Sequence, residues 1–459
     1  MTTDNLHPTR RTHYDIIIDG GGMVGVSLAC ALAKVDKGNV LSVLLVDSFP
    51  DKRLASHDDS QGPVYHPSFD ARSTALSLAS IETYESMGLL PALLQHASPI
   101  RQVHVSDRGH MGSTLLDANA QNKNAFGYVI ENQWLGEVLL NHLATLPAIE
   151  RITGANVGNI IPKQDGVSVD ITSGADTEDH RSSHGLSSSE PSSSEPSTLT
   201  ASLLIVADGA QSGLRDSLGI TASVKRYDQR AVIANVQTQL PHNGQAFERF
   251  VADGAVAFLP LIDLPNSKNR SALVWTMPTH IESDKDKTLL DDEAFIAELQ
   301  KAFGHRLGTI QRIGQRQSYP LALTIADEVV RNHIVLMGNS AHSLHPVAGQ
   351  GFNLSLRDIA ALVERIGGAI EQQLNNADDV EMIEDVGSLA LLENYAEAQI
   401  KDQNLTIGFS HNLIELFGQQ NLPVQLGRNL GLLALDLLGP AKNRFSDRAA
   451  GITGRKSLR

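Results

Sequence analysis

The sequence predicts an α/β fold in which a parallel sheet carries an inserted, largely antiparallel sheet and the chain ends in helices. Three observations support this prediction. A short apolar strand leads into three consecutive glycines, a helical pattern and a second apolar strand; residues 225–323 contain several strand-like segments; and a long helical remainder reaches the C-terminus. At 459 residues the chain is long enough for about two or three domains.

Composition excludes several classes of protein. The chain has 37 basic and 52 acidic residues and a net charge of −15, so it would repel a phosphate backbone, and no nucleic-acid partner is expected. The single cysteine, Cys30, cannot form an internal disulfide and suits a reducing, cytoplasmic setting. No run approaches the roughly 18 apolar residues of a membrane-spanning helix, although contact with a membrane surface stays open.

The first unit is Rossmann-like. An apolar strand at 14–18 precedes a helix expected at about 24–35, and a second strand at 40–46 ends at Asp47. Between the first strand and the helix, the G-x-G-x-x-G pattern is formed by Gly20, Gly22 and Gly25. Glycines at these positions permit a tight turn, approach of a pyrophosphate to the backbone, and close helix packing. Asp47 could accept hydrogen bonds from a ribose, so the unit predicts dinucleotide binding.

A polar insertion follows later in the chain. Residues 172–200 are rich in serine and are expected to form a disordered loop. Apolar strands at 167–171 and 203–207 flank it, so it should lengthen a turn rather than separate two domains.

Beyond the insertion the pattern becomes that of an antiparallel sheet. Strand-like segments occur at 231–236, 256–259 and 272–275, with one helical stretch at 291–303. Two earlier segments, 103–106 and 128–130, are expected to pair into the same sheet.

Two more glycine-containing motifs follow apolar strands. The first spans 207–215 and contains Asp208, Gly209 and Arg215; the second spans 337–353. A nicotinamide dehydrogenase would need only the first fingerprint at 20–25. With all three motifs in this order, the chain resembles the aromatic-ring hydroxylases, which are single-component FAD-dependent monooxygenases. Segments 103–110, 231–236, 246–250 and 319–323 narrow the resemblance to the ubiquinone-biosynthesis hydroxylases.

The resemblance implies a discontinuous FAD-binding domain with an inserted substrate domain. The expected division is 12–97, 129–224 and 331–400 for the FAD-binding domain, 98–128 and 225–330 for the substrate-binding sheet, and 401–459 for a C-terminal helical region.

The resemblance also assigns cofactor contacts beyond the first glycine turn. The loop of Pro346, Gly349 and Gly351 would position the flavin for catalysis, because its glycines let the backbone approach a flat ring and a helix starts there. Asn339 stands where the family has aspartate, so that contact would lack a charge. The expected contacts in full are Arg72, Gln133, Asp208, Gly209, Gly338, Asn339, Pro346, Gly349, Gln350, Gly351 and Asn353.

The implied activity is hydroxylation of the aromatic ring of a polyprenylated methoxyphenol by a flavin C4a-hydroperoxide, with oxygen as co-substrate and NAD(P)H as the expected transient reductant. Hydroxylation of another ring position, a soluble phenol as substrate, and an FAD-dependent dehydrogenase remain alternatives. A prenylated substrate implies contact with the inner membrane, for which 405–438 is a candidate, or with a quinone-biosynthesis complex.

Neither a metal site nor a catalytic base is predicted. His342 and His345 lack a third ligand at suitable spacing. Several polar residues should lie on the second sheet near pocket edges, but the sequence does not distinguish a base among them: His104, Arg108, His110, Glu248 and Arg249.

Overall fold

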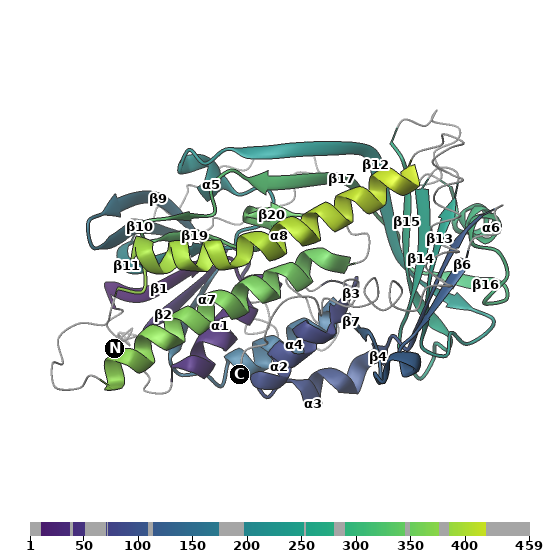
Figure 1. The fold of residues 1–459 in the computed structure, drawn as a ribbon, viewed down its shortest axis with the longest axis horizontal. Helices are drawn as coiled ribbons and strands as arrows, with labels where there is room; N and C mark the ends of the chain where they lie inside the picture. The colour runs from purple at the N-terminus through teal and green to yellow at the C-terminus, as the bar shows by residue number, and fades with distance from the viewer. Residues whose placement is uncertain are drawn as a thin grey trace, which may run out of the picture.

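The computed structural model describes residues 11–36, 40–50, 70, 72–108, 113–173, 197–251, 254–279, 290–344, 349–375 and 385–418. These residues form two large sheets with helices between and around them (Figure 1). The predicted α/β class, with an inserted sheet and helices at the end of the described chain, is confirmed.

The first sheet has the predicted parallel core. β1 (His13–Asp19) pairs in parallel with β2 (Val43–Asp47) and with β11 (Ser197–Val206), and β2 pairs in parallel with β8 (Ile149–Thr153). α1 (Met23–Val35) connects β1 to β2 and is buried along most of its length, as the apolar pattern predicts. The other members of the sheet are β9 (Ala155–Lys163), β10 (Gly166–Ser173), β18 (Val330–Arg331) and β19 (Ile334–Leu336).

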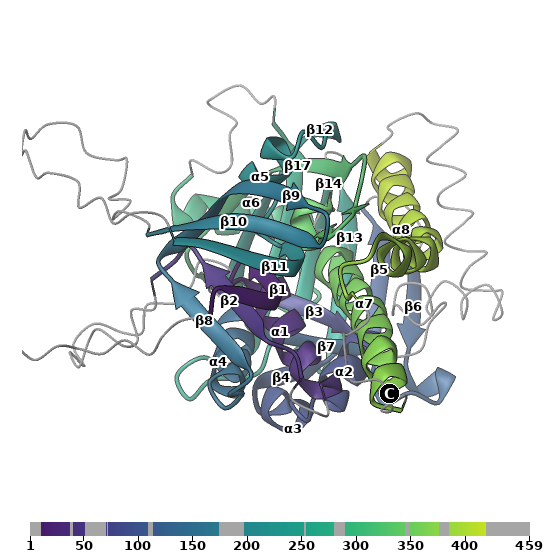
Figure 2. The ribbon, with the colours of Figure 1, turned by 90° about the vertical axis from the view of Figure 1, so that its left-hand side faces the viewer.

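The faces of the first sheet are covered differently. Helices α1 and α7 (Gln350–Asn375) pack on one face, and β9 and β10 fold over the other (Figure 2). The remaining helices of this region are α2 (Leu78–Ser86), α3 (Leu90–Leu93), α4 (Asn132–Leu143) and α5 (Gly213–Ser217).

The serine-rich insertion interrupts a hairpin. β10 and β11 pair antiparallel up to the Ile171–Ser197 pair, so residues 172–173 and 197–200 of the predicted loop belong to strands. The rest of that loop, 174–196, lies outside the described residues.

The second sheet is nine-stranded and mostly antiparallel, in the order β20-β17-β12-β15-β14-β13-β5-β6, with β16 beside β12. The expected pairing of 103–106 is confirmed, because β5 lies parallel to β13 and antiparallel to β6. The strands are β5 (Gln102–Asp107), β6 (Ser113–Asp117), β12 (Ala222–Thr238), β13 (Gln245–Val251), β14 (Gly254–Pro260), β15 (Arg270–Pro278), β16 (Ile310–Ile313), β17 (Gln317–Ala326) and β20 (His342–Ser343).

The expected pairing of 128–130 into this sheet is wrong. These residues belong to β7 (Gly127–Glu131), which pairs with β3 (Ser73–Ser77) and β4 (Ala97–Pro99) in a separate small sheet. α2 follows β3 and α4 follows β7 without a break, and both helices bury apolar side chains in the core beneath α1. The helices α2 and α4 therefore tie the small sheet to the core of the first sheet.

The nine-stranded sheet has two distinct faces. α6 (Asp292–Phe303) covers the outer face, where Phe295 contacts Trp275 and Phe303 stacks on Phe258. The inner face turns toward the small sheet (Figure 1). Side chains on the inner face can therefore point toward the glycine turns.

A buried polar contact joins the final helices. Asp358 of α7 lies 2.6 Å from His342 Nε2 and accepts hydrogen bonds from Gln399 and Gln403 of α8 (Leu389–Gly418). α8 is continuous through residue 400, so the boundary expected there falls inside a helix. No helix within the described ranges is long and apolar enough to cross a membrane.

Candidate active site

The first glycine turn is closely packed. Gly20, at the end of β1, has a φ of +119°, and a Cβ there would lie 2.3 Å from the carbonyl oxygen of Ala207. A Cβ on Gly25 would lie 1.9 Å from the carbonyl oxygen of Gly20. Gly22 is the N-cap of α1 and supplies no side-chain cap, so the first amides of α1 remain available to an anion.

Asp47 lies against this turn. A Cβ on Gly21 would be 2.1 Å from Asp47 Oδ2, so the carboxylate reaches the backbone of the turn. Its Oδ1 accepts the Phe49 amide at 3.0 Å, and its Oδ2 pairs with Arg151 at 3.2 Å. These contacts fix the carboxylate at the predicted position; acceptance of a ribose hydroxyl stays a prediction.

The second motif lies beside the first. Gly20 is in contact with Ala207, and Gly209, with φ +107°, has no atom within 4 Å of the place a Cβ would occupy. Asp208 accepts hydrogen bonds from Ser212 and the Leu214 amide; burial nevertheless raises the pKa of Asp208 above its usual value.

Arg215 links the second motif to the third. It is buried, and its guanidinium donates to the Ser340 carbonyl at 3.2 Å. Gly338 has a φ of +70°, and a Cβ there would be 3.0 Å from Val24 of α1. Asn339 is exposed beside these turns, with no side-chain partner in the described part of the chain. The side-chain amide of Asn339 is available to form a hydrogen bond with a hydroxyl group. Unlike an aspartate, it would bring no negative charge to that contact.

The predicted flavin loop is partly described. Gly349, with φ +60°, lies beside β3, where a Cβ would be 3.5 Å from that of Ala75. Gln350 and Gly351 form the first turn of α7, whose leading amides have no partner within the helix. Pro346, like His345, lies outside the described residues.

Asn353 has a structural role in this loop. Its Nδ2 donates to the carbonyls of Ala75 and Gly349, and its Oδ1 accepts from the Ser77 amide and the Ser80 hydroxyl. The side chain is buried and its hydrogen-bonding capacity is used. It therefore positions Gly349 rather than offering its side chain to a ligand.

Arg72 and Gln133, both expected to contact the cofactor, lie close together. The amide of Gln133 donates to the Asp70 carbonyl at 3.1 Å, while the Arg72 guanidinium pairs with the Asp70 carboxylate at 2.6 Å. Arg72 also lies over the Tyr319 ring, 5.1 Å from its centroid. Arg72, directly before β3, thus contacts the inner face of the nine-stranded sheet.

Sequence reasoning missed the ion pair that joins the small sheet to the nine-stranded sheet. Arg270 of β15 makes a bidentate contact with Glu131 of β7, with N–O distances of 2.6 and 3.1 Å. Asn235 of β12 also donates to Glu131, at 3.2 Å. No local pattern marks residues that meet only when two sheets pack.

His104 and Arg249 lie on the outer face, away from the glycine turns. Arg249 donates to the Phe303 carbonyl at the end of α6, and His104 contacts Arg306 at 2.6 Å. Burial, together with neighbouring arginines, lowers the pKa of His104 to about 4. Arg108 is exposed at the end of β5, and His110 lies outside the described residues.

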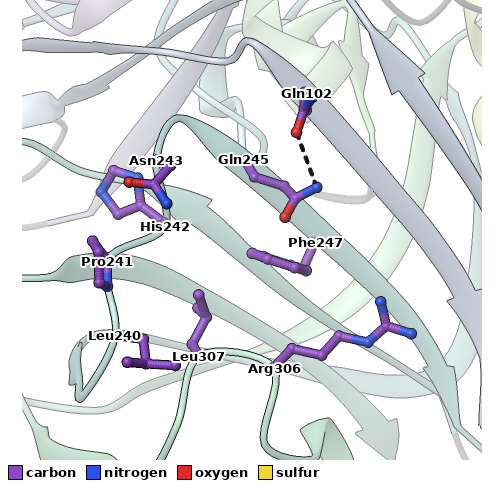
Figure 3. A pocket seen from close by; sticks show the side chains of 9 residues that line it. All are labelled: Gln102, Leu240, Pro241, His242, Asn243, Gln245, Phe247, Arg306 and Leu307. Carbon is purple, nitrogen blue, oxygen red and sulfur yellow. Dashed lines mark hydrogen bonds between the residues drawn. The ribbon is translucent and has the colours of Figure 1, made fainter.

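A pocket of about 380 Å³ adjoins these outer-face residues. Figure 3 shows it between the loop 240–243 and the side chains of Gln102, Gln245 and Arg306. None of the predicted cofactor contacts lines it, so it is separate from the glycine turns.

Sequence reasoning also missed Asp19, the last residue of β1. It is buried directly before the glycine turn, and burial, with Asp208 and Asp47 nearby, raises its pKa to about 8. Asp19 is therefore largely protonated at neutral pH, which limits negative charge where an anion would bind.

Asp19 should make the protein without ligand less stable as pH rises. Its carboxyl titrates near 8 when folded but near 3.8 when unfolded, so between these values unfolding releases a proton. Each pH unit in this window can cost up to about 1.4 kcal/mol. We expect Asp19→Asn to raise the urea midpoint of the apoprotein at pH 8 and to change it little near pH 4. An unchanged pH slope would contradict this assignment.

The three glycine motifs fit a dinucleotide. Their turns meet at one edge of the parallel sheet, Gly20 and Gly25 leave no space for a side chain, and no side chain caps the N-terminus of α1 there. The described residues contain no group of three ligands that could hold a metal ion. Fold and site together define a dinucleotide-binding protein that carries a second, mostly antiparallel sheet.

Comparisons with known proteins agree with a dinucleotide-binding site and identify the dinucleotide as FAD. The model of the FAD binding domain family matches residues 13–377. Ubiquinone hydroxylase UbiL of Rhodospirillum rubrum is 34% identical over 95% of this chain and 89% of its own length. The human ubiquinone biosynthesis monooxygenase COQ6, mitochondrial, is 26% identical over 95% of this chain and 92% of its own.

Solved structures share the fold. The p-nitrophenol 4-monooxygenase PnpA of Pseudomonas putida DLL-E4 matches with a TM-score of 0.71 at 17% identity, over 97% of this chain and 100% of that one. The chain is an FAD-dependent monooxygenase. It belongs to the FAD binding domain family and, within it, to the ubiquinone-biosynthesis hydroxylases.

Proposed function

We propose that this protein hydroxylates the aromatic ring of a polyprenylated methoxyphenol during ubiquinone biosynthesis, with oxygen as co-substrate and NAD(P)H as transient reductant. The observation that carries the proposal is the match to the ubiquinone hydroxylase of Rhodospirillum rubrum along 95% of the chain. A dehydrogenase lacks comparable support, because the relatives reported above are named as a hydroxylase and a monooxygenase.

One group of residues would bind the cofactor, and another surface would orient the substrate. The amides of α1 and the turns at Gly20 and Gly209 would hold the pyrophosphate, while Gly349 and Gly351 would let the ring system approach the backbone. Asn339 would bind a sugar or ribityl hydroxyl. When bound, FAD supplies the redox chemistry that activates oxygen. The inner face of the nine-stranded sheet would orient the phenol and exclude water.

Mass spectrometry of lipids from cells lacking the gene tests the function. We expect ubiquinone to fall and a prenylated methoxyphenol lacking one ring oxygen to accumulate. Reintroducing the gene should reverse both changes. A normal ubiquinone pool, in cells without a second hydroxylase, would contradict the proposal and favour another ring position or a soluble phenol.

We also propose a peripheral contact with the inner membrane, where a polyprenylated substrate would reside. Ile400 and Leu405 of α8 support it, because their side chains are 54% and 59% exposed. Most of the candidate segment 405–438 lies outside the described residues. We expect the protein to float with zwitterionic phospholipid vesicles, and Ile400→Ser with Leu405→Ser to reduce the bound fraction severalfold. Equal flotation of both proteins would contradict this contact.

A further inference from the structure

Glu248 lies in the middle of β13 and points to the inner face of the nine-stranded sheet. Its neighbours establish this direction. The Phe247 ring contacts Phe303 of α6 at a centroid distance of 5.6 Å, and Arg249 donates to the Phe303 carbonyl at 2.8 Å. Because side chains alternate along a strand, Glu248 must project on the face opposite α6.

The surroundings of Glu248 on this face are apolar. Val105 of β5 and Ala257 of β14 are its direct partners in the register, and Val274 lies one strand beyond Ala257. On β13 itself, Ala246 and Phe250 share the face. These side chains cannot accept or donate a hydrogen bond.

The carboxyl of Glu248 has no hydrogen-bond or ion-pair partner in the part of the chain that the structure describes. Burial raises its pKa to about 7. Among the neighbouring elements, β14 contributes no charged group to this face, and β5 contributes Asp107, in register with Phe250. Glu248 is half-buried, and a carboxyl with a raised pKa and no partner on this face is a candidate for function.

The same face is connected to the cofactor site. Tyr319 of β17, in register with Ala231, lies on it and is covered by Arg72. Asn235 and Arg270 on this face donate hydrogen bonds to the carboxylate of Glu131. Glu131 belongs to β7 and lies opposite Ser73 of β3 in the small sheet. β3 in turn touches the flavin loop through Ala75 and Gly349. The inner face is therefore linked through β7 and β3 to the loop where a flavin ring would be held.

We propose that Glu248 accepts the proton of the ring hydroxyl of the phenolic substrate. The O–H bond breaks, the proton moves to the Glu248 carboxylate, and the electron pair stays on the phenol oxygen. That charge spreads into the ring and makes the carbons ortho and para to the oxygen more nucleophilic. Glu248 releases the proton to solvent after turnover. This inference rests on the proposed function, since it requires a phenol as substrate.

The ionisation of Glu248 fixes the direction of the pH effect. Only the carboxylate can accept the proton, and its population increases as pH rises through about 7. Hydroxylation by the FAD-loaded wild-type protein should therefore rise between pH 6 and 8. Removal of a general base commonly costs about 10²–10⁴-fold in rate.

The test compares Glu248→Gln with Glu298→Gln in the FAD-loaded protein. Glu298 is on α6, where it pairs with Lys301, so this control removes a carboxylate from the outer side of the sheet. The probe is 2-methoxyphenol carrying one prenyl group. We expect Glu248→Gln to form product about 100-fold more slowly, with a flat pH profile. A ring-fluorinated probe, which ionises more readily, should recover part of the rate, and Glu298→Gln should match the wild type.

Binding provides a second readout that needs no turnover. The probe and its methyl ether, which lacks the ring O–H, are titrated against each protein and followed by the flavin spectrum. We expect wild-type affinity for the phenol to rise with pH through about 7 and affinity for the ether to stay constant. In Glu248→Gln both should be independent of pH.

The possible failures can be told apart. A wild-type protein that binds the phenol with the expected pH dependence but forms no hydroxylated product would overturn the proposed substrate and leave the Glu248 contact standing. A Glu248→Gln protein with the wild-type rate and pH profile would overturn the role of Glu248. Equal losses with the ordinary and fluorinated probes would also overturn it, because they would indicate a structural role only.

Discussion

Replacing Gly25 by alanine is expected to abolish FAD retention. The new methyl group would lie 1.9 Å from the carbonyl oxygen of Gly20, a backbone atom that cannot rotate away. α1 would have to move off the turn, and its N-terminus would no longer face the pyrophosphate. We expect the ratio of bound flavin to protein after gel filtration to fall at least about tenfold, equivalent to about 1.4 kcal/mol or more of binding free energy.

Gly408→Ala is the matched control for this variant. Gly408 also lies within a helix, α8, but a Cβ there would have no atom within 4 Å. We expect Gly408→Ala to retain FAD fully and to be as stable as the parent or slightly more so. Circular dichroism of both apoproteins separates loss of the cofactor from loss of the fold. A folded Gly25→Ala protein with normal flavin content would refute the cofactor site.

Removing the charge of Glu131 should be the most destabilising single change at the contact between the small sheet and the nine-stranded sheet. The Arg270 side chain is only 9% exposed, so Glu131→Gln would leave a buried guanidinium without its counter-charge. Breaking a buried pair in this way costs about 3–5 kcal/mol; because the Glu131 side chain is 23% exposed, we expect the lower end, about 3 kcal/mol. Urea unfolding at neutral pH measures the loss.

A double variant distinguishes the unpaired charge from lost packing. Glu131→Leu combined with Arg270→Met replaces the pair by apolar side chains of similar size, and such replacements are often close to neutral. We expect the double variant to be more stable than Glu131→Gln alone. Equal or greater destabilisation in the double variant would show that the cost does not arise from the unpaired charge of Arg270.

Local patterns in the sequence were sufficient to predict the parallel core. The alternation of apolar strand, glycine turn and helix at 13–35 is dictated by contacts within one βαβ unit, and β1, α1 and β2 form as expected. The three glycine motifs each follow a strand of the parallel sheet, and carboxyl ends of parallel strands meet at one edge. The positions of Gly20, Gly209 and Gly338 near one another follow from that rule.

Other features depend on contacts between distant segments. The apolar residues of β7 suit either sheet, and only the packing of α2 and α4 decides that it pairs with β3. The faces of β13 could not be assigned before its register with β5 and β14 was known, so Glu248 and Arg249 looked equivalent. The structural role of Asn353 could not be predicted, because its hydrogen bonds to Ala75 and Ser77 join residues far apart in the sequence.

Isotopic labelling of the product tests the central claim most directly. The purified FAD-loaded protein would be supplied with NADH or NADPH, the prenylated methoxyphenol probe and oxygen-18 gas, and the product analysed by mass spectrometry. The account predicts one labelled oxygen atom on the aromatic ring, since a monooxygenase transfers one atom of the oxygen molecule. A ring hydroxyl that carries oxygen from water, or oxidation of the reductant with no ring hydroxylation at all, would contradict it.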